Sequence, residues 1–515
     1  MPIVIRRASN LLLPFIGVVL FVLAVLIPTF ALAIRSLAAL GQPTETALMT
    51  ARQWSLLWFT VKLAAAAAAA TIVLSLPGAY VVGRARGSGP PVLLAIPLLL
   101  PPMVLVFGWQ KVLGWSSISL DMPRRWWMCV LLWASWSWPI PALVLGAAWQ
   151  KLARSAFESA VLETTPARAF LRVARITLGG QLAACAVILF ALFCGEYTVP
   201  HACGLIVYAT ELLGWASTAK QPVEVVAPAL PMVVLIATSV GLAAVILRRR
   251  SVPMSSETGA PSGTTGAKSL AVVSTILLVV TVAIPLSALL AKMFVHPRSG
   301  AAPGVAGPMA LAWRTYHGAL LESAVVAGVA GMLAALLGAG VVVWQRVARW
   351  MGVWTLLFGL LPGALIGEAL LAAYRPVNVI YGGWPIVVIA YLARYAWVGV
   401  LASWLALAAT GRDLVEQARS DGAGELTVTA RIRLAAALPI LVCGAAIVAA
   451  LSLADVATAS MVQVPSVQLI SLILIDKYHR FEDGMLISLS LWLVAAALPA
   501  AILLAVARRA RGWHG

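Results

Sequence analysis

Long apolar runs separated by short polar segments dominate the chain. Within each run the apolar positions are continuous and do not alternate with polar ones. A helix of about 20 residues is about 30 Å long, which matches the hydrocarbon thickness of a bilayer. We predict twelve membrane-spanning helices, near residues 11–34, 55–82, 92–112, 127–149, 178–195, 226–247, 269–292, 319–344, 351–374, 385–409, 435–453 and 484–506.

Lipid as the solvent favours helices over strands. In hydrocarbon a backbone N–H or C=O group has no water to bond, so a spanning segment must be a helix or belong to a closed barrel. The strands of such barrels alternate apolar and polar residues, and the runs in this chain do not. The expected fold is therefore all-α and polytopic.

A stretch rich in Ser, Gly, Thr and Pro separates the first six predicted spans from the last six. This composition, over residues 248–268, is typical of a flexible linker. We therefore predict a first half at 1–247 and a second half at 269–515. Because six spans return a half to its starting side, the halves would be parallel repeats about an axis along the membrane normal, with a pathway at their interface.

Composition and charge agree with a multi-pass membrane protein. Only 10% of the residues are charged, against roughly a quarter in soluble domains. With both termini cytoplasmic, the predicted cytoplasmic segments hold 22 of the 36 lysines and arginines. This bias follows the positive-inside rule, so we expect a protein of the bacterial inner (plasma) membrane. We expect its net charge of +18 to interact with anionic lipid and not with nucleic acid.

The N-terminal run is predicted to be a retained span. Residues 31–33 (Ala-Leu-Ala) resemble a signal-peptidase site, but the run at 11–34 is longer than the 7–15 residues of a signal sequence's apolar core.

Residues for metal, nucleotide or catalytic chemistry are scattered. The five cysteines and five histidines have no metal-ligand spacing, so we predict no metal site and no cofactor. The segment 263–269 (Gly-Thr-Thr-Gly-Ala-Lys-Ser) resembles a phosphate-binding loop but lacks the glycine directly before lysine. We predict that the chain is not an enzyme and that any ATPase is a separate subunit.

Two predicted cytoplasmic loops share a pattern. Each lies between the fourth and fifth span of its half, and equivalent positions are 258 residues apart. The equivalent pairs are Ser155 with Asp413, Glu158 with Glu416, Ala160 with Ala418, and Thr164 with Gly422.

Each loop is predicted to form a short helix. The first residue of Ser155-x-x-Glu158 and of Asp413-x-x-Glu416 would cap the helix, and the glutamate would bond back to the cap. Gly422 would end the second helix. A capping box is common in loop helices, but two copies in equivalent loops indicate a shared role.

At these residues the chain resembles the permease subunits of ABC importers. The loop signature of that family is Glu-Ala-Ala, three residues, Gly, nine residues, then Ile-x-Leu-Pro. The second copy matches it at Glu416, Ala418, Gly422, Ile432 and Leu434, with Gln417 and Ala435 as departures. In the first copy Glu158 and Ala160 match, while Ser159 and Thr164 depart from it.

The resemblance implies partners and a role for the loops. The two loop helices would be coupling helices docked on two cytoplasmic ATPase subunits, with an extracytoplasmic binding protein delivering substrate. Single chains with two such halves resemble the ferric-iron and thiamine branch of these importers. The segment 194–200 (Cys-Gly-Glu-Tyr-Thr-Val-Pro) also resembles a segment common in that branch. An ion-gradient-driven transporter with twelve spans is the alternative, but it does not predict the duplicated loops.

Four ionisable residues at membrane depth are candidates for the pathway, because such groups are costly in lipid. We expect Glu196 and Asp455, which lie 259 positions apart, to line the outer mouth from the two halves. Glu368 and Arg394 would form a pair, or Arg394 would serve structure alone by snorkelling or ion pairing. The prolines at 101, 102 and 362 lie inside predicted spans; either they break the helices near the pathway or, the interpretation we favour, they form simple kinks.

Overall fold

The computed structural model describes residues 2–39, 49–84, 89–114, 121–150, 159–160, 162–218, 223–249, 267–295, 305–409, 412–480 and 482–509. Throughout these ranges the chain is helical, with three π-helical segments (η1–η3) and no strand. The elements of the first half are α1 (Pro2–Phe21), η1 (Val22–Leu26), α2 (Ile27–Ala39), α3 (Ala51–Arg84), α4 (Gly89–Leu99), α5 (Pro102–Leu113), α6 (Met122–Ser137), α7 (Pro139–Gln150), α9 (Pro166–Gly195), α10 (Thr198–Ala202), α11 (Tyr208–Thr218) and α12 (Val223–Arg249). Those of the second half are α13 (Ala267–Leu278), η2 (Val279–Ala283), α14 (Ile284–Val295), α15 (Ala306–Val343), α16 (Gln345–Leu360), α17 (Gly363–Tyr374), α18 (Asn378–Tyr381), α19 (Trp384–Ala409), α20 (Arg412–Ser420), α21 (Glu425–Thr427), η3 (Val428–Arg433), α22 (Leu434–Ala454), α23 (Ala457–Met461), α24 (Ile470–His479) and α25 (Asp483–Arg509).

The prediction of an all-α, multi-pass membrane protein is confirmed. Within the described ranges, eight helices are long and apolar enough to cross a membrane, and the number is eleven if three bent pairs each count as one span. The last predicted span, 484–506, coincides with α25, whose segment Asp483–Ala496 is a shorter apolar helix.

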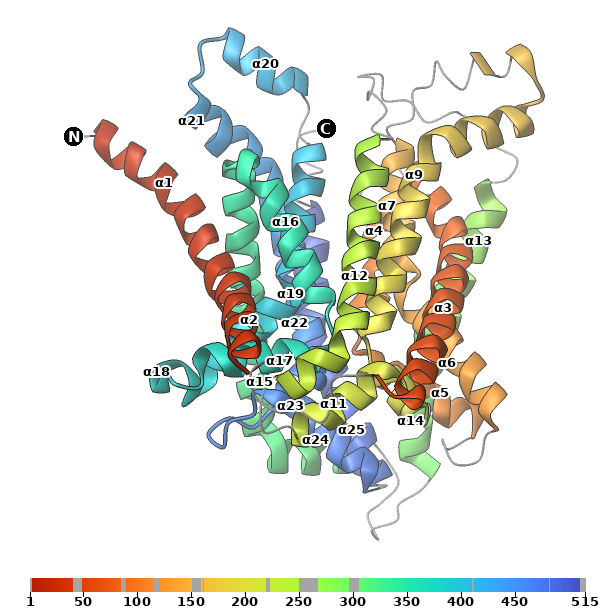
Figure 1. Ribbon diagram of the computed structural model, residues 1–515. Helices are drawn as coiled ribbons and strands as arrows, with labels where there is room; N and C mark the ends of the chain where they lie inside the picture. The colour runs from red at the N-terminus through yellow and green to blue at the C-terminus, as the bar shows by residue number, and fades with distance from the viewer. Residues whose placement is uncertain are drawn as a thin grey trace.

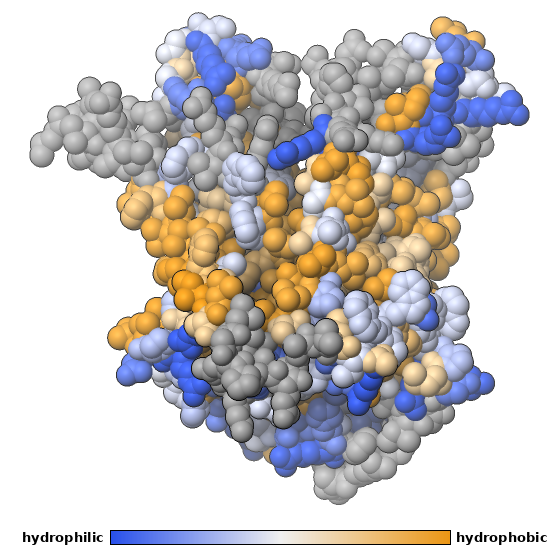
Figure 2. All heavy atoms as spheres, in the orientation of Figure 1, coloured by the Kyte–Doolittle hydropathy of each residue, from blue (hydrophilic) through white to orange (hydrophobic). Residues whose placement is uncertain are grey.

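An apolar belt crosses the middle of the molecule on the face shown in Figure 2. Large side chains such as Phe15, Trp58, Ile276 and Val325 are 53–64% exposed on it. Polar side chains gather above and below the belt. The end with α20 is called here the α20 face, and the opposite end, with α24, the α24 face (Figure 1). The chain begins with α1 and ends with α25 at the α20 face (Figure 1).

Two spans are broken at proline. The pair α4 and α5 bends by 92° and the pair α16 and α17 by 111°. Pro101 and Pro362 are the N-cap residues of α5 and α17, with ψ of 128° and 136°. Since proline lacks an N–H and disfavours helical conformation in the residue before it, each helix stops. The favoured interpretation of simple kinks at Pro101 and Pro362 is therefore wrong, and the alternative, broken helices, is what the structure has.

Matching irregularities recur in the two halves. Segments η1 and η2 each precede an Ile-Pro pair, at Ile27 and Ile284. The long helices α9 and α22 both end at an acidic residue and are followed by five-residue helices, α10 and α23. The same order of a broken span, a long helix and a short helix therefore appears twice along the chain.

The first helices of the two halves are exchanged. The α1–α2 segment packs against α15 and α17, and the α13–α14 segment packs against α3 and α5. Tyr374 of α17 donates a hydrogen bond to the carbonyl of Leu23 at 2.5 Å. The contact between Gly108 of α5 and Pro285 of α14 is so close that a Cβ at position 108 would lie 2.5 Å from the proline. Residues of 1–247 and 269–515 therefore build each other's core.

Glycines allow the helices of the second half to approach backbone to backbone. A Cβ at Gly331 of α15 would overlap the carbonyl oxygen of Ala445 on α22. A Cβ at Gly399 of α19 would overlap the carbonyl oxygen of Ala334 on α15. Small residues at such crossings bring whole helix surfaces into van der Waals contact, the main attraction between helices in lipid.

We predict opposite effects for alanine at two glycines one turn apart on α15. Gly331→Ala places a methyl group against the Ala445 carbonyl and should destabilise the protein by about 1–3 kcal/mol through overpacking. Gly328→Ala meets no atom within 4 Å and should keep or raise stability, because alanine is the better helix former. Thermal unfolding in detergent measures both, and equal midpoints would contradict the close packing.

Candidate functional site

A cavity of about 260 Å³ lies between elements of the two halves. Its walls come mainly from α7 and α9 of the first half and from α19 and α22 of the second. Along α22 the lining runs from Ile440 to Ala454, which is about 20 Å of helix. Most of the lining is apolar; the charged residues in it are Glu196, Arg394 and Asp455. Three of the four predicted pathway residues therefore share one cavity.

Glu196 follows the last residue of α9 and caps α10. Its Oε1 accepts from the N–H of Thr198 at 2.6 Å and its Oε2 from that of Val199 at 3.2 Å. Trp133 of α6 donates its indole N–H to Oε2 at 2.8 Å. Three donors thus satisfy this carboxylate, and the positive end of α10 faces it.

Asp455 takes the equivalent place after α22, and its surroundings differ. Its Oδ1 accepts from the N–H of Thr458 at 3.2 Å, which caps α23. Its Oδ2 has no hydrogen-bond partner among the described residues, although the residue is only 6% exposed. The positive charge of Arg394 acts on this carboxylate. One half therefore presents a satisfied acid and the other an acid with a bonding position left over.

Arg394 and Trp136 hold the two helix breaks. Arg394 of α19 donates to the carbonyl of Leu361, the residue before Pro362. Trp136 of α6 donates its indole N–H to the carbonyl of Leu100, the residue before Pro101, at 3.2 Å. These carbonyls have lost their helical partners, and a buried unpaired carbonyl costs about 1–3 kcal/mol. Arg394 thus has a structural partner as well as a place in the cavity wall.

Glu368 lies outside the cavity, and its expected pairing with Arg394 is wrong. The cationic groups that act on Glu368 are Arg35 and Arg375. Arg394 instead bonds Leu361 and acts on Asp455. Glu368 belongs to α17, which follows the 111° turn after α16, and it does not line the cavity. Of the four predicted residues, Glu368 is the one that the structure places elsewhere.

The two halves are joined at the α24 face. The Nε2 atoms of His201 (α10) and His479 (α24) are 3.0 Å apart. Next to them, Tyr478 donates to the carbonyl of Ala202 at 3.0 Å, and Lys111 of α5 pairs with Asp483 of α25 at 2.6 Å. Burial, then the neighbouring His479, lowers the pKa of His201, which favours the neutral form of the His201 imidazole.

At the α20 face, α20 and α21 project from the apolar belt (Figure 1). Gly422, at φ +81°, ends α20 as predicted. Its N–H bonds the Arg419 carbonyl at 3.0 Å, and the N–H of Ala423 bonds the Ala418 carbonyl at 2.9 Å. This closure needs a left-handed residue, which glycine adopts without strain.

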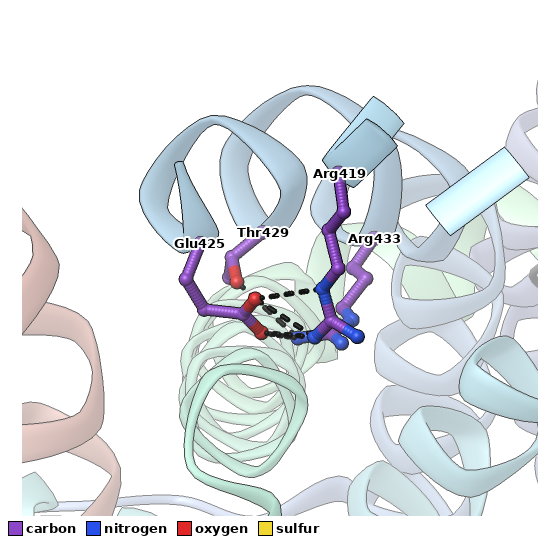
Figure 3. Close-up of polar contacts among 4 residues, drawn as sticks. All are labelled: Arg419, Glu425, Thr429 and Arg433. Atoms are coloured by element: carbon purple, nitrogen blue, oxygen red, sulfur yellow. Dashed lines mark hydrogen bonds and ion pairs between the residues drawn. The ribbon is translucent and has the colours of Figure 1, made fainter. Parts of the chain in front are cut away.

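One carboxylate holds the segment after α20 in shape (Figure 3). Glu425 accepts from Arg419 at 2.8 Å and from Arg433 at 2.9 Å. These arginines, Arg419 first, hold the pKa of Glu425 below its usual value. The clamp therefore persists at pH values where free glutamate is already protonating. It connects the end of α20 to η3, the base of spanning helix α22.

The predicted loop residues have different outcomes. Ser155 and Glu158 lie outside the described residues. Asp413 lies in the first turn of α20, one residue past its start at Arg412, and Glu416 is exposed on that helix. Ala160 and Thr164 precede α9. Near them Glu163 pairs with Arg172 at 3.1 Å; the Glu425–Arg433 pair is also a glutamate–arginine pair after a predicted loop helix, but the two pairs do not stand 258 residues apart.

The sequence interpretation did not identify Trp136, His201 or His479 as site residues. Trp136 occupies the position in the first half that Arg394 has in the second, 258 residues apart, so the repeat spacing alone could have found it. The histidines lie 278 positions apart, and no periodicity in the sequence joins them.

Comparisons of the chain with protein-family models, with curated proteins and with solved structures gave no match.

We predict that Trp136→Phe destabilises the protein by about 1–3 kcal/mol, because the Leu100 carbonyl loses its donor while the aromatic volume is nearly kept. Trp127→Phe is the matched control, since Trp127 is 58% exposed on the neighbouring part of α6. Thermal unfolding in detergent compares the two, and equal midpoints would show that the break does not depend on this bond.

Proposed function

We propose that the chain is the membrane permease subunit of an ABC importer, driven by two separate cytoplasmic ATPase subunits. The observation that carries this is the α20 segment: a short polar helix outside the apolar belt, ended by a left-handed glycine and clamped to a spanning helix. The equivalent loop in the first half has the same spacing in sequence, and a glutamate–arginine pair, Glu163 with Arg172, follows it as well. Such an element can transmit a push from a docked partner to the spans.

The cavity supports a transport pathway between the halves. It is lined by residues of both halves. At the α24 face the histidine pair and the Lys111–Asp483 pair connect the halves, and the cavity extends along α22 as far as Ile440, near the base of that helix. We assign this conformer to the state closed toward the outside. Rocking of the halves would then open the α24 face, a two-state change that ATP and substrate both bias.

Twelve spans in two parallel halves complete the proposal. Eleven spans follow if each bent pair counts once, and α25 adds the twelfth. With the α20 face cytoplasmic, both ends of the chain are cytoplasmic, in the inner (plasma) membrane of a bacterium. Substrate would arrive from an extracytoplasmic binding protein at the α24 face, and this chain would have no nucleotide site. Ferric iron and thiamine-like compounds are the substrate candidates from the resemblance.

An ion-gradient-driven transporter would use the same cavity but would have no need of α20. Affinity purification of the tagged chain from native membranes separates the two functions. We expect a stoichiometric ATPase subunit to co-purify, and to be lost when Glu158→Gln is combined with Glu416→Gln. A stable chain without an ATPase would favour the ion-gradient mechanism.

We predict that Gly422→Val abolishes ATPase co-purification and uptake while leaving membrane insertion intact. A β-branched residue is strongly disfavoured at φ +81°, so the end of α20 must change shape. Gly424→Val is the control, because Gly424 has φ −64° and ψ 155° with nothing within 4 Å of a Cβ. Equal loss with both variants would point to a general effect of the loop and count against the docking assignment.

We predict that Glu196→Gln combined with Asp455→Asn lowers uptake at least about tenfold, because the cavity loses both negative charges. The ATPase subunit should still co-purify, since both positions are remote in sequence and structure from α20. Uptake assays in cells together with the affinity purification test this. Unchanged uptake would exclude these carboxylates from the pathway.

A further inference from the structure

The wall of the cavity includes one buried carboxylate, Asp455, whose surroundings give it fewer hydrogen bonds than Glu196 receives. Asp455 is 6% exposed and lines the cavity, and its Oδ2 has no hydrogen-bond partner among the described residues. A buried carboxylate oxygen without a partner is unfavourable. Arg394 acts on it electrostatically but is hydrogen-bonded to Leu361. Glu196, by contrast, receives three hydrogen bonds.

Aromatic rings make up much of the wall near these acids. Trp133, Trp136, Tyr395 and Trp397 line the cavity, and Trp133 stacks on Phe193 with ring centroids 4.9 Å apart. The remaining wall is mostly Leu, Ile, Val and Ala. Aromatic faces attract cations, and more strongly where water is excluded. The volume of about 260 Å³ is near the lower end for pockets that hold small organic molecules.

The balance of charge favours a monovalent cation. Two carboxylates and one guanidinium line the cavity, so its side chains carry one net negative charge when all are ionised. A bare metal ion needs several oxygen or nitrogen ligands, and no group of three or more His, Cys, Asp and Glu side chains converges in the described part of the chain. Aromatic walls and one net negative charge instead fit a cationic head on an apolar body.

We propose that the permease itself has a substrate-selecting site in this cavity, which binds an organic cation with Asp455 as its counter-charge. The proposal rests on the proposed transport function and deepens it, since selection is then shared between the binding protein and the membrane subunit. Asp455 binds the charged head, the aromatic side chains enclose it, and the apolar wall along α22 contacts the body of the cation. Glu196, already bonded, shapes α10 and adds negative potential.

Binding of benzyltrimethylammonium to the full chain in lipid nanodiscs, without ATPase subunits, tests the site by isothermal titration calorimetry. We expect this cation to bind at least about tenfold more tightly than benzyl alcohol or benzenesulfonate. Asp455→Asn should weaken cation binding at least about tenfold. Asp476→Asn is the matched control, because Asp476 is an exposed carboxylate on α24 paired with Arg480 and does not line the cavity.

Equal binding of the three probes, binding of none, or an unaltered affinity of Asp455→Asn for the cation would overturn the proposal. These outcomes are independent of ATPase co-purification, so failure of the site is distinguishable from failure of the transport assignment.

A second measurement keeps Asp455 in place, in case Asp455→Asn does not fold. Leu451 lines the cavity one turn before Asp455. In Leu451→Cys, benzyltrimethylammonium should slow alkylation of the new thiol by N-ethylmaleimide at least about threefold. The slowing should be larger than at Cys443, which also lines the cavity but lies two turns farther from Asp455 along α22. Mass spectrometry of the labelled peptides reads both positions. No protection at position 451 would place the probe elsewhere and overturn the assignment.

Discussion

The need to satisfy every backbone polar group inside the apolar belt governs this architecture. Unbroken helices meet it by themselves, but the spans at Pro101 and Pro362 end within the protein and turn by 92° and 111°. At each turn a side chain from a neighbouring helix bonds the carbonyl before the proline: Trp136 at Leu100 and Arg394 at Leu361. Irregular backbone at membrane depth persists only where protein or a cavity surrounds it, and both turns lie beside the cavity, which Pro102 and Gly359 help to line.

The two halves share a backbone plan and differ in chemistry at equivalent positions. A neutral indole on one side corresponds to a guanidinium on the other, and a fully bonded glutamate corresponds to an aspartate with an unbonded oxygen. A symmetric pathway would present the same groups from both sides. Here two opposite charges, Arg394 and Asp455, lie in the second half and one negative charge, Glu196, lies in the first, so the two sides of the cavity present different groups.

Much of the fold could be predicted from the sequence, because apolar run length reports directly on a helix that crosses lipid. The runs located all eight long helices and the three bent pairs. From the sequence, helix breaks at Pro101 and Pro362 could not be distinguished from the favoured simple kinks, because proline alone is compatible with both; the turn depends on the donors Trp136 and Arg394 on other helices. Glu196, Arg394 and Asp455 could be identified as candidates from the sequence, because ionisable residues are costly in lipid. The cations next to Glu368, Arg35 and Arg375, could be identified only from the three-dimensional structure.

The exchanged first helices have a consequence for biosynthesis. Helix α1 packs on α15, and Gly17 of α1 contacts this helix. The ribosome reaches the first residue of α15 roughly 290 residues after Gly17. At about 5–20 residues per second, this is a delay on the order of tens of seconds. During that time α1 and α2 are in the bilayer without their final neighbours. A nascent first half is therefore a target for membrane proteases and insertion chaperones until the second half emerges, and truncated chains would expose the surface that α15 and α17 normally cover.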